Sequence, residues 1–208
     1  MSPKFYPLGD SCCVINFGKE ISKELSLKIL HLYKCFKSPT FHSAILDVVP
    51  TYNAIAFYFD LSKTSYSEVS SFLQNTLSNI TLEEQNNLKS LSHLFKINYC
   101  GEDLQRLASI HKLSIQKIIE LHTQPTYTVA MIGFKPHFPY LIGLDSKLST
   151  PRLESPRTHV SPGAVAIGGD QTGIYPSSSP GGWNILGYTD PAQCKKLQPG
   201  DQIRFEAL

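Results

Sequence analysis

The apolar residues of the first 60 positions follow two spacings, one typical of strands and one typical of a helix. Residues 5–18, FYPLGDSCCVINFG, offer a strand, and residues 44–49 and 54–60 offer two more on either side of the turn-prone PTYN. Between the first and second of these strands, apolar side chains recur every three or four positions, as in a helix. This stretch follows Ser22, a residue type that suits a helix N-cap. These helical positions are Leu25, Ile29, Leu32, Tyr33 and Phe36. The chain therefore begins as strand, helix, strand, strand.

A second helix and one further strand extend this order. The apolar positions of the helix are Val69, Phe72, Leu73, Leu77 and Ile80. A strand at residues 94–100, LFKINYC, would complete a βαββαβ unit of the ferredoxin-like type. The polar residues 81–90 can equally be a linker that leaves this strand to a second domain, and the pattern alone does not decide. We expect an N-terminal domain at residues 1–90 and a C-terminal domain at residues 91–208.

Two short helices followed by a barrel are predicted beyond residue 100. Apolar positions within 104–111 and 115–122 have helical spacing, and Ser114 is placed to cap the second helix. Residues 131–208 hold ten of the 13 glycines and nine of the 14 prolines. Short strands alternate with these turn residues from Thr126 onward, at TYTVAMIGF, GAVAIGG, WNILGYT and DQIRFEAL. Many brief strands joined by such turns favour a small closed β-barrel.

Charge and composition exclude several classes of protein. The 208 residues include 19 Lys and Arg against 17 Asp and Glu, and a net charge of +2 gives no basic footprint for nucleic acid. No apolar run approaches the roughly 18 residues that a membrane helix needs, and the N-terminus lacks the apolar core of a signal peptide. We therefore expect a cytoplasmic protein with no membrane partner. The five cysteines and seven histidines show no zinc-binding spacing, so we expect no metal or organic cofactor.

Three long motifs carry a resemblance to a known family. They are GFKPHFPYLIGL at residues 133–144, STPRLESPRTHVSPGAVAIGGDQTGIYP at 149–176 and SPGGWNILGYT at 179–189. In this order and spacing they resemble the B subunit of the ATP-hydrolysing 5-oxoprolinase, which shares its family with allophanate hydrolase subunit 1 and the sporulation kinase inhibitor KipI. The resemblance implies an α+β protein, with an N-terminal ferredoxin-like βαββαβ domain followed by a C-terminal cyclophilin-like antiparallel β-barrel.

The same resemblance implies a function that needs other chains. It implies that the chain works with a homologous C subunit and a LamB/YcsF-type A subunit to open 5-oxo-L-proline to L-glutamate with ATP. The sequence contains no G-x-x-x-x-G-K-[ST] phosphate loop, so we expect ATP to be bound mainly by a partner subunit. Two alternatives stay open: a KipI-type inhibitor of a histidine kinase, and subunit 1 of an allophanate or urea amide hydrolase.

The candidate catalytic residues are Arg152, Arg157 and His122. The two arginines stand five residues apart in TPRLESPR, and a guanidinium fork suits the carboxylate of 5-oxoproline or a phosphorylated intermediate. Their other interpretation is a pair of surface or interface arginines on a proline-stiffened loop. His122 lies at a helix-to-strand junction, where an imidazole could act as a general base. Its other interpretation is a hydrogen-bonded, partly buried histidine, which the apolar helical stripe that it completes favours.

Five further residues are candidates for substrate binding or for an interface. Gln171, Thr172 and Tyr175 follow a Gly-Gly pair at which backbone can approach a ligand closely. His137 replaces the glycine that the resemblance leads us to expect, and histidine is one of the residues that tolerate a left-handed backbone. Trp183, the single tryptophan, follows a Pro-Gly-Gly turn and could face the barrel core, a cleft or a partner subunit.

Overall fold

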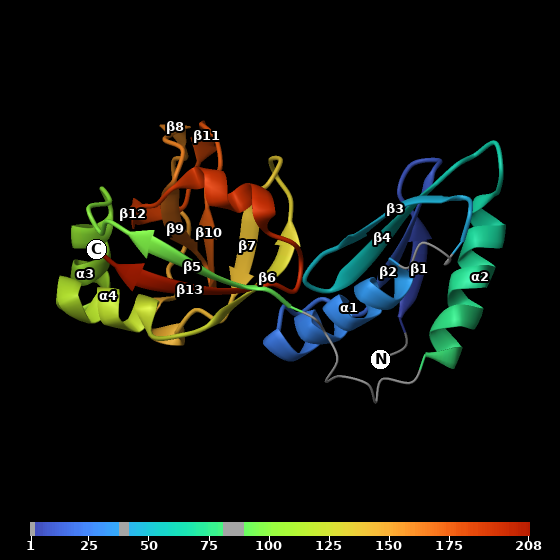
Figure 1. The fold of residues 1–208 in the computed structure, drawn as a ribbon, viewed down its shortest axis with the longest axis horizontal. Coiled ribbons are helices and arrows are strands. Elements are labelled where there is room, and N and C mark those ends of the chain that lie inside the picture. The colour runs from blue at the N-terminus through green and yellow to red at the C-terminus, as the bar shows by residue number, and fades with distance from the viewer. Residues whose placement is uncertain (1–2, 38–41, 81–89) are drawn as a thin grey trace. The chain divides into compact units, whose positions relative to one another are not determined.

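The computed structural model describes residues 3–37, 42–80 and 90–208, and the chain forms two compact units (Figure 1). The first unit is Met1–Lys89 and the second is Ser90–Leu208. In the described part of the chain, no helix is long and apolar enough to cross a bilayer. Nor do three or more His, Cys, Asp or Glu side chains of those residues gather into a possible metal site.

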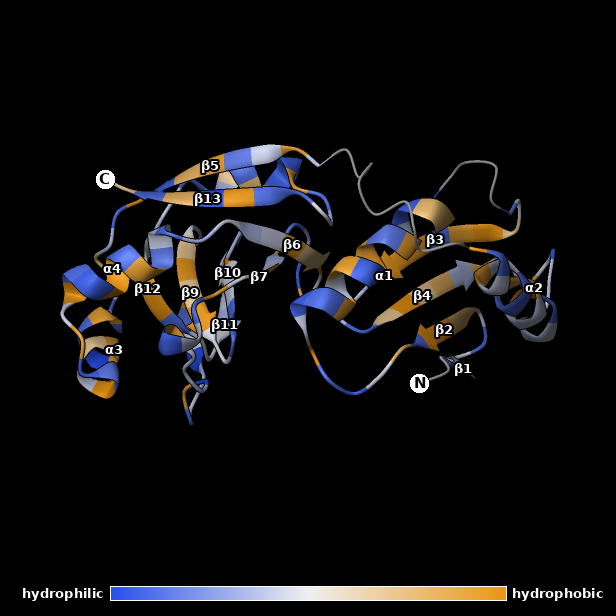
Figure 2. Ribbon diagram, turned by 90° about the horizontal axis from the view of Figure 1, so that it is seen from below, coloured by the Kyte–Doolittle hydropathy of each residue, from blue (hydrophilic) through white to orange (hydrophobic). Residues whose placement is uncertain are grey.

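The first unit is a four-stranded antiparallel sheet with two helices packed on one face. Its elements are β1 (Lys4–Pro7), β2 (Cys12–Asn16), α1 (Lys23–Phe36), β3 (Ile45–Pro50), β4 (Ala54–Phe59) and α2 (Tyr66–Asn79). The strand order is β1-β2-β4-β3. Apolar residues of both helices and of the inner sheet face form one buried core. Figure 2 shows the amphipathic character of α1, in which hydrophobic and hydrophilic segments alternate.

Local signals in the sequence explain how these helices begin. The side chain of Ser22 accepts a hydrogen bond from the backbone N–H of Leu25, as expected for the N-cap of α1. Ser65 and Glu68 form a capping box at the start of α2, in which each side chain satisfies a backbone N–H of the other residue. The predicted N-cap at Ser22 is therefore confirmed, and both helix positions follow from the sequence pattern.

The α+β fold class is confirmed, but the strand expected to complete the βαββαβ unit lies elsewhere. Residues Ser92–Ile97 form β5, which pairs with a strand of the second unit. The edge of the first sheet beside β2 is instead taken by β1, so the observed order is ββαββα. The reason is visible in the burial of β5, because Phe95 and Ile97 belong to the apolar core of the second unit.

The second unit is a nearly closed barrel with two helices packed against it. Its strands are β5 (Ser92–Ile97), β6 (Tyr127–Ile132), β7 (Pro139–Ile142), β8 (Arg157–Val160), β9 (Ala164–Gly168), β10 (Gln171–Ile174), β11 (Ser179–Gly181), β12 (Asn184–Tyr188) and β13 (Gln202–Ala207). Seven of them form one sheet in the order β12-β9-β10-β7-β6-β13-β5, and β8 pairs with β11 in a separate ribbon. The first and last strands meet through an antiparallel bridge between Asn98 and Tyr188. That bridge brings the two ends of the sheet together.

Two details of this barrel differ from the simplest expectation. The pairing of β5 with β13 is parallel, whereas the other pairs in the sheet are antiparallel. The four strands predicted from residue 126 onward are present as β6, β9, β12 and β13, and shorter strands lie between them. The sequence does not predict these shorter strands, because runs of three or four residues carry little periodicity.

The helices α3 (Leu104–His111) and α4 (Ile115–Thr123) cover one side of the barrel. The side chain of Ser114 accepts a hydrogen bond from the backbone N–H of Lys117, which confirms the predicted cap of α4. Short 3₁₀ helices follow at Ser146–Leu148 and Pro191–Lys196. Buried residues of α3 and α4 pack against Ile167 and Leu186 of the sheet, so the helices and the barrel share a core.

Candidate functional site

Trp183 lies at the centre of an aromatic cluster on one side of the barrel. Its side chain is only 5% exposed, and its ring centroid lies 5.9 Å from that of Phe138 and 5.7 Å from that of Tyr140, both in edge-to-face geometry. Tyr175 joins the group through Phe138, with centroids 5.0 Å apart. We call Phe138, Tyr140, Tyr175 and Trp183 the aromatic cluster. Its packing places Trp183 within the protein core rather than on an open loop.

Three glycines leave the space that these aromatic rings occupy. A Cβ atom on Gly168 would lie 2.5 Å from the indole of Trp183, and one on Gly173 would lie 3.0 Å from Phe138 and Trp183. A Cβ atom on Gly181 would lie 2.4 Å from the hydroxyl of Tyr175. Any side chain at Gly168 or Gly181 would therefore displace an aromatic ring, which explains glycine at positions on or beside the strands.

Arg152 lies over the ring of Trp183, at the edge of this cluster. Its guanidinium carbon lies 5.7 Å from the centroid of Trp183, in a cation–π arrangement, and its side chain is exposed. Burial raises the pKa values of Tyr140 and Tyr175, and the charge of Arg152 acts on both in the opposite direction. Within residues 3–37, 42–80 and 90–208, Arg152 has no ion-pair or hydrogen-bond partner. Arg152 is therefore a solvent-facing cation beside an aromatic surface.

Arg157 is in a different environment, although only five residues separate the two arginines. Its Nη2 atom lies 2.7 Å from both carboxylate oxygens of Asp103, and its Nη1 donates to the carbonyl of Trp183 at 3.3 Å. Asp103 is 4% exposed and also accepts a hydrogen bond from the backbone N–H of Ile185. These contacts join β8, the start of α3 and β12. The donors of Arg157 are thus engaged within the protein itself.

His122 occupies the interior of the barrel, away from Arg152. Its ring is fully buried and stacks on Phe205 with centroids 4.8 Å apart. Nδ1 lies 2.7 Å from the hydroxyl of Tyr99, and Nε2 lies 3.1 Å from the hydroxyl of Thr172. The Thr172 hydroxyl in turn donates to the carbonyl of Ala166, so Nε2 carries the imidazole proton and donates it to Thr172.

Burial lowers the pKa of His122 to about 3, because the interior disfavours the charged imidazolium. A neutral ring with both nitrogens occupied by hydrogen bonds cannot take a proton from a solvent-side substrate near neutral pH without breaking this network. Of the two interpretations that the sequence leaves open for His122, this geometry favours the buried, hydrogen-bonded histidine. Thr172, predicted as a binding residue, belongs to the same interior network.

The remaining predicted residues lie at different depths around the cluster. Gln171 is half-buried at the start of β10, opposite Gly168 of β9. His137 is exposed and has a φ of 67°, so it takes the left-handed conformation expected of a residue that replaces glycine. Phe134, in the same loop, has a φ of 65° and is 62% exposed. The structure therefore gathers Arg152, Tyr175 and Trp183, and keeps the pair of His122 and Thr172 apart from them.

Two residues with clear roles in this arrangement are not predicted from the sequence. Asp103 carries no motif, and its partner Arg157 lies 54 residues away, so no local spacing could reveal the pair. Tyr99 donates to His122 from a segment predicted only as the end of a strand. The helix start at residues 103–104 is the one signal that could have marked Asp103, as an acidic residue before an apolar helical stripe.

Comparison with known proteins gives consistent relatives along nearly the whole chain. Residues 3–196 match the family described as carboxyltransferase domain, subdomain C and D. The chain is 30% identical to the 5-oxoprolinase B subunit of Bacillus subtilis over 217 aligned positions, which cover 95% of this chain and 90% of that protein. It is 51% identical to the 5-oxoprolinase B subunit of Haemophilus influenzae over 112 positions, about half of each chain.

Parts of two solved structures share the fold of this chain over nearly its full length. The structure of TTHA0988 has a TM-score of 0.81 and 33% identity, covering 96% of this chain and 40% of that one. The urea carboxylase of Kluyveromyces lactis has a TM-score of 0.78 at 17% identity, covering 99% of this chain and 22% of that one, and shows the fold alone. The chain thus spans less than half of either solved protein. It belongs to the carboxyltransferase-domain family of subdomains C and D, which includes the B subunit of 5-oxoprolinase.

Proposed function

We propose that this chain is the B subunit of an ATP-dependent 5-oxoprolinase, in which it works with a homologous C subunit and a LamB/YcsF-type A subunit. The complex opens 5-oxo-L-proline to L-glutamate with hydrolysis of ATP. The observation that carries this proposal is the 30% identity to the 5-oxoprolinase B subunit of Bacillus subtilis along 95% of the chain. These relatives are named as one subunit of an enzyme, which supports the presence of partner chains. We propose that ATP binds mainly to one of those partners.

Arg152 is the group of this chain that we assign to the substrate. 5-Oxoproline carries a carboxylate on a five-membered ring, and a guanidinium offers paired N–H donors to a carboxylate in a fixed plane. The donors of Arg157 are directed at Asp103 and Trp183, whereas Arg152 is exposed above the aromatic cluster. The geometry therefore supports Arg152 over Arg157 as the anion-binding residue.

An aromatic residue beside Arg152 would contact the ring of the substrate. Tyr140 is half-buried beside Arg152, so a ring bound by Arg152 would meet the accessible part of its aromatic side chain, whereas Trp183 is 5% exposed and already covered by the guanidinium. Burial raises the pKa values of Tyr140 and Tyr175 further above neutrality, which makes their hydroxyls poor groups for proton transfer. We therefore propose that this chain holds and orients the substrate, while the groups that activate the lactam belong to the partner subunits.

Reconstitution tests this function directly. The chain is co-expressed with the LamB/YcsF-type and homologous partner subunits, the complex is purified, and glutamate release from 5-oxoproline is measured with and without ATP. We expect release that requires both ATP and this chain. A correctly assembled complex that releases no glutamate would contradict the proposal. Inhibition of histidine kinase autophosphorylation by the isolated chain would instead support the KipI-type alternative, and release of ammonia from allophanate would support the amide hydrolase alternative.

A further inference from the structure

Two hydrogen bonds hold the peptide groups on either side of Arg152. The backbone N–H of Leu153 donates to the carbonyl of Gly182 at 2.7 Å. The side chain of Asn184 donates from Nδ2 to the carbonyl of Pro151 at 3.0 Å. Each peptide group is planar, and these two groups meet at the Cα atom of Arg152. Together the two bonds therefore set the backbone dihedral angles of Arg152 and the direction in which its side chain leaves the loop.

The side chain of Asn184 is itself held in one orientation. Asn184 begins β12 and is fully buried. Its Nδ2 also donates to the carbonyl of Ile167 at 3.2 Å, and its Oδ1 accepts a hydrogen bond from Nη1 of Arg106. A guanidinium can only donate, so the oxygen of the carboxamide faces Arg106 and the nitrogen faces the two carbonyls. Both amide hydrogens of Asn184 are thus used within the protein, one of them on Pro151.

The residue between Gly182 and Asn184 is Trp183, over which the guanidinium of Arg152 lies. Its ring is fixed in the aromatic cluster by Phe138 and Tyr140. Arg152 itself is exposed, and an exposed arginine whose backbone is free samples many rotamers. The place of the guanidinium over the ring therefore depends on the two bonds that hold the loop.

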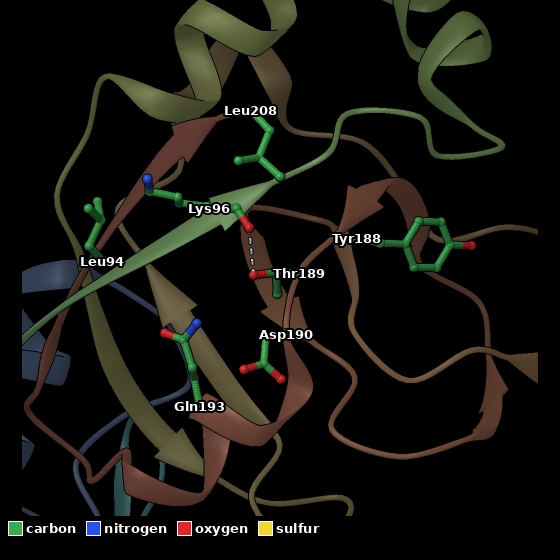
Figure 3. Close-up of a pocket in the computed structure, with 7 residues that line it drawn as sticks. All are labelled: Leu94, Lys96, Tyr188, Thr189, Asp190, Gln193 and Leu208. Atoms are coloured by element: carbon green, nitrogen blue, oxygen red, sulfur yellow. Dashed lines mark hydrogen bonds between the residues drawn. The ribbon is translucent and has the colours of Figure 1, made fainter.

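An open pocket of the second unit offers no second guanidinium for the same task. It has a volume of about 560 Å³ and is lined by residues that include Lys96 and Asp190 (Figure 3). The ammonium of Lys96 lies 3.8 Å from a carboxylate oxygen of Glu206. The carboxylate of Asp190 accepts a hydrogen bond from the N–H of Ala192. Arg152 does not line this pocket, so the loop contacts, rather than the walls of the pocket, orient its side chain.

We infer that Asn184 is a positioning residue, which directs the guanidinium of Arg152 toward the carboxylate of 5-oxoproline by holding the carbonyl of Pro151. The inference rests on the proposed function, because it takes its substrate from there. A guanidinium makes its paired hydrogen bonds to a carboxylate in one plane, so a change in its direction loses contact even when the charge stays. Asn184 acts only through Arg152, since its own side chain is buried and its amide hydrogens are occupied.

Replacement of Asn184 by aspartate removes the donor and keeps the shape. Beside Arg106 the new carboxylate stays ionised, so it accepts from that guanidinium and donates nothing to Pro151. In the reconstituted complex we expect Asn184→Asp to raise the KM for 5-oxoproline about tenfold with little change in kcat, because an orienting contact for substrate binding is lost.

A double-mutant cycle separates positioning from a general loss of stability. In the Arg152→Lys background, Asn184→Asp should cause no further loss of kcat/KM, because the guanidinium that Asn184 directs is already absent. Losses of equal size in both backgrounds would overturn the inference, as would an unchanged KM in an active complex. The unmodified complex would still release glutamate in either case, so the proposed function would stand.

NMR spectroscopy of the isolated chain tests the same link without using activity. The ring current of Trp183 should shift the side-chain proton signals of Arg152 upfield, and Arg152→Lys identifies these signals by their loss. We expect Asn184→Asp to move them toward the positions of an unstructured arginine. Arg106→Met, at an exposed position, should move them in the same direction, because the carboxamide is no longer held from its oxygen side. If Asn184→Asp does not fold, Arg106→Met decides alone.

Thr150→Val is the matched control. The hydroxyl of Thr150 is buried and donates to the carbonyl of Leu148 in the same loop, but it holds neither of the peptide groups that meet at Arg152. The Arg152 signals and the KM should therefore stay close to those of the unmodified chain. Arg152 signals that do not move in any folded variant overturn the inference, whether or not the complex is active. Signals that move as expected, in a chain whose assembled complex releases no glutamate, support the role of Asn184 in orienting Arg152 and count against the proposed function alone.

Discussion

The guanidinium of Arg157 and the carboxylate of Asp103 form a pair that joins residues 54 positions apart, with Nη2 2.7 Å from each carboxylate oxygen. Asp103 is 4% exposed, so its carboxylate is held by this partner and by the N–H of Ile185 in place of water. Breaking such a pair from one side leaves a buried charge without its counter-ion, which costs more than the intact pair contributes. Replacing Arg157 and replacing Arg152 should therefore have different effects on the protein.

Replacing Arg157 should destabilise the second unit. In Arg157→Met the carboxylate of Asp103 stays buried without its cation, and we expect the free energy of unfolding to fall by about 3 kcal/mol. Urea unfolding of the purified chain measures this change. Arg152→Met is the control, because Arg152 is exposed and its loss should cost no more than about 1 kcal/mol. Equal losses in the two variants would show that the pair with Asp103 adds no stability.

Replacing Arg152 should instead affect the reaction. Lysine keeps the positive charge but cannot reproduce the planar pair of donors. In the reconstituted complex we expect Arg152→Lys to lower kcat/KM for 5-oxoproline between about tenfold and a hundredfold, while the three chains still assemble. Steady-state kinetics and gel filtration provide the two measurements. Unchanged kinetics with normal assembly would remove Arg152 from the substrate site.

Much of the fold follows from local patterns in the sequence. Ser22 and Ser114 cap the helices that their positions predict, and the strands at residues 126–134 and 201–208 appear as β6 and β13. Each of these elements is specified by residues within a few positions of one another. What the pattern could not decide was the partner of the strand near residue 95. Its alternating apolar residues fit either sheet, and only the packing of Phe95 and Ile97 assigns it to the barrel.

The candidate site is harder to predict for the same physical reason. Sequence spacing places Arg152 and Arg157 together as two equivalent cations, and it gives no sign that Asp103 pairs with one of them. It also cannot distinguish a buried His122 from a catalytic one, because the partners Tyr99 and Thr172 lie 23 and 50 residues away. Contacts between distant segments decide which polar groups are free, and one sequence does not display them.

The packing of Trp183 against Gly168 can be tested through the fluorescence of Trp183 itself. A methyl group at Gly168 would lie 2.5 Å from the indole, so Gly168→Ala must displace the ring. We expect a loss of about 1–3 kcal/mol in the free energy of unfolding, as in other overpacked cores. Trp183 is the single tryptophan, so its fluorescence should also shift to longer wavelength as the ring becomes more exposed.

Gly182→Ala is the matched control for this packing argument. A Cβ atom there would have its nearest neighbours at 3.6 Å, on Pro156, which is ordinary van der Waals contact. Both the stability and the emission maximum of Gly182→Ala should therefore remain close to those of the unmodified chain. If Gly168→Ala behaves in the same way as this control, the ring of Trp183 does not occupy the space above β9.

The buried His122 should make the protein lose stability in mild acid. Its pKa is about 3 in the folded chain, below the value of about 6.5 in an unfolded one. The unfolded chain therefore binds a proton below about pH 6.5 that the folded chain does not bind. Stability from this residue is fully present above that pH and decreases as the pH falls toward 3. Between pH 7 and pH 5 the expected loss is about 2 kcal/mol.

Substitution by glutamine isolates the contribution of this histidine from that of the other titrating groups. Glutamine can still accept from Tyr99 or donate to Thr172, but it has no proton to gain. Urea unfolding at pH 7, 6 and 5 should show that the unmodified chain loses about 2 kcal/mol more than His122→Gln over this range. Parallel losses in the two proteins would mean that His122 is charged in the folded state as readily as in the unfolded state. Its imidazole would then be open to protons, and the general-base role would regain support.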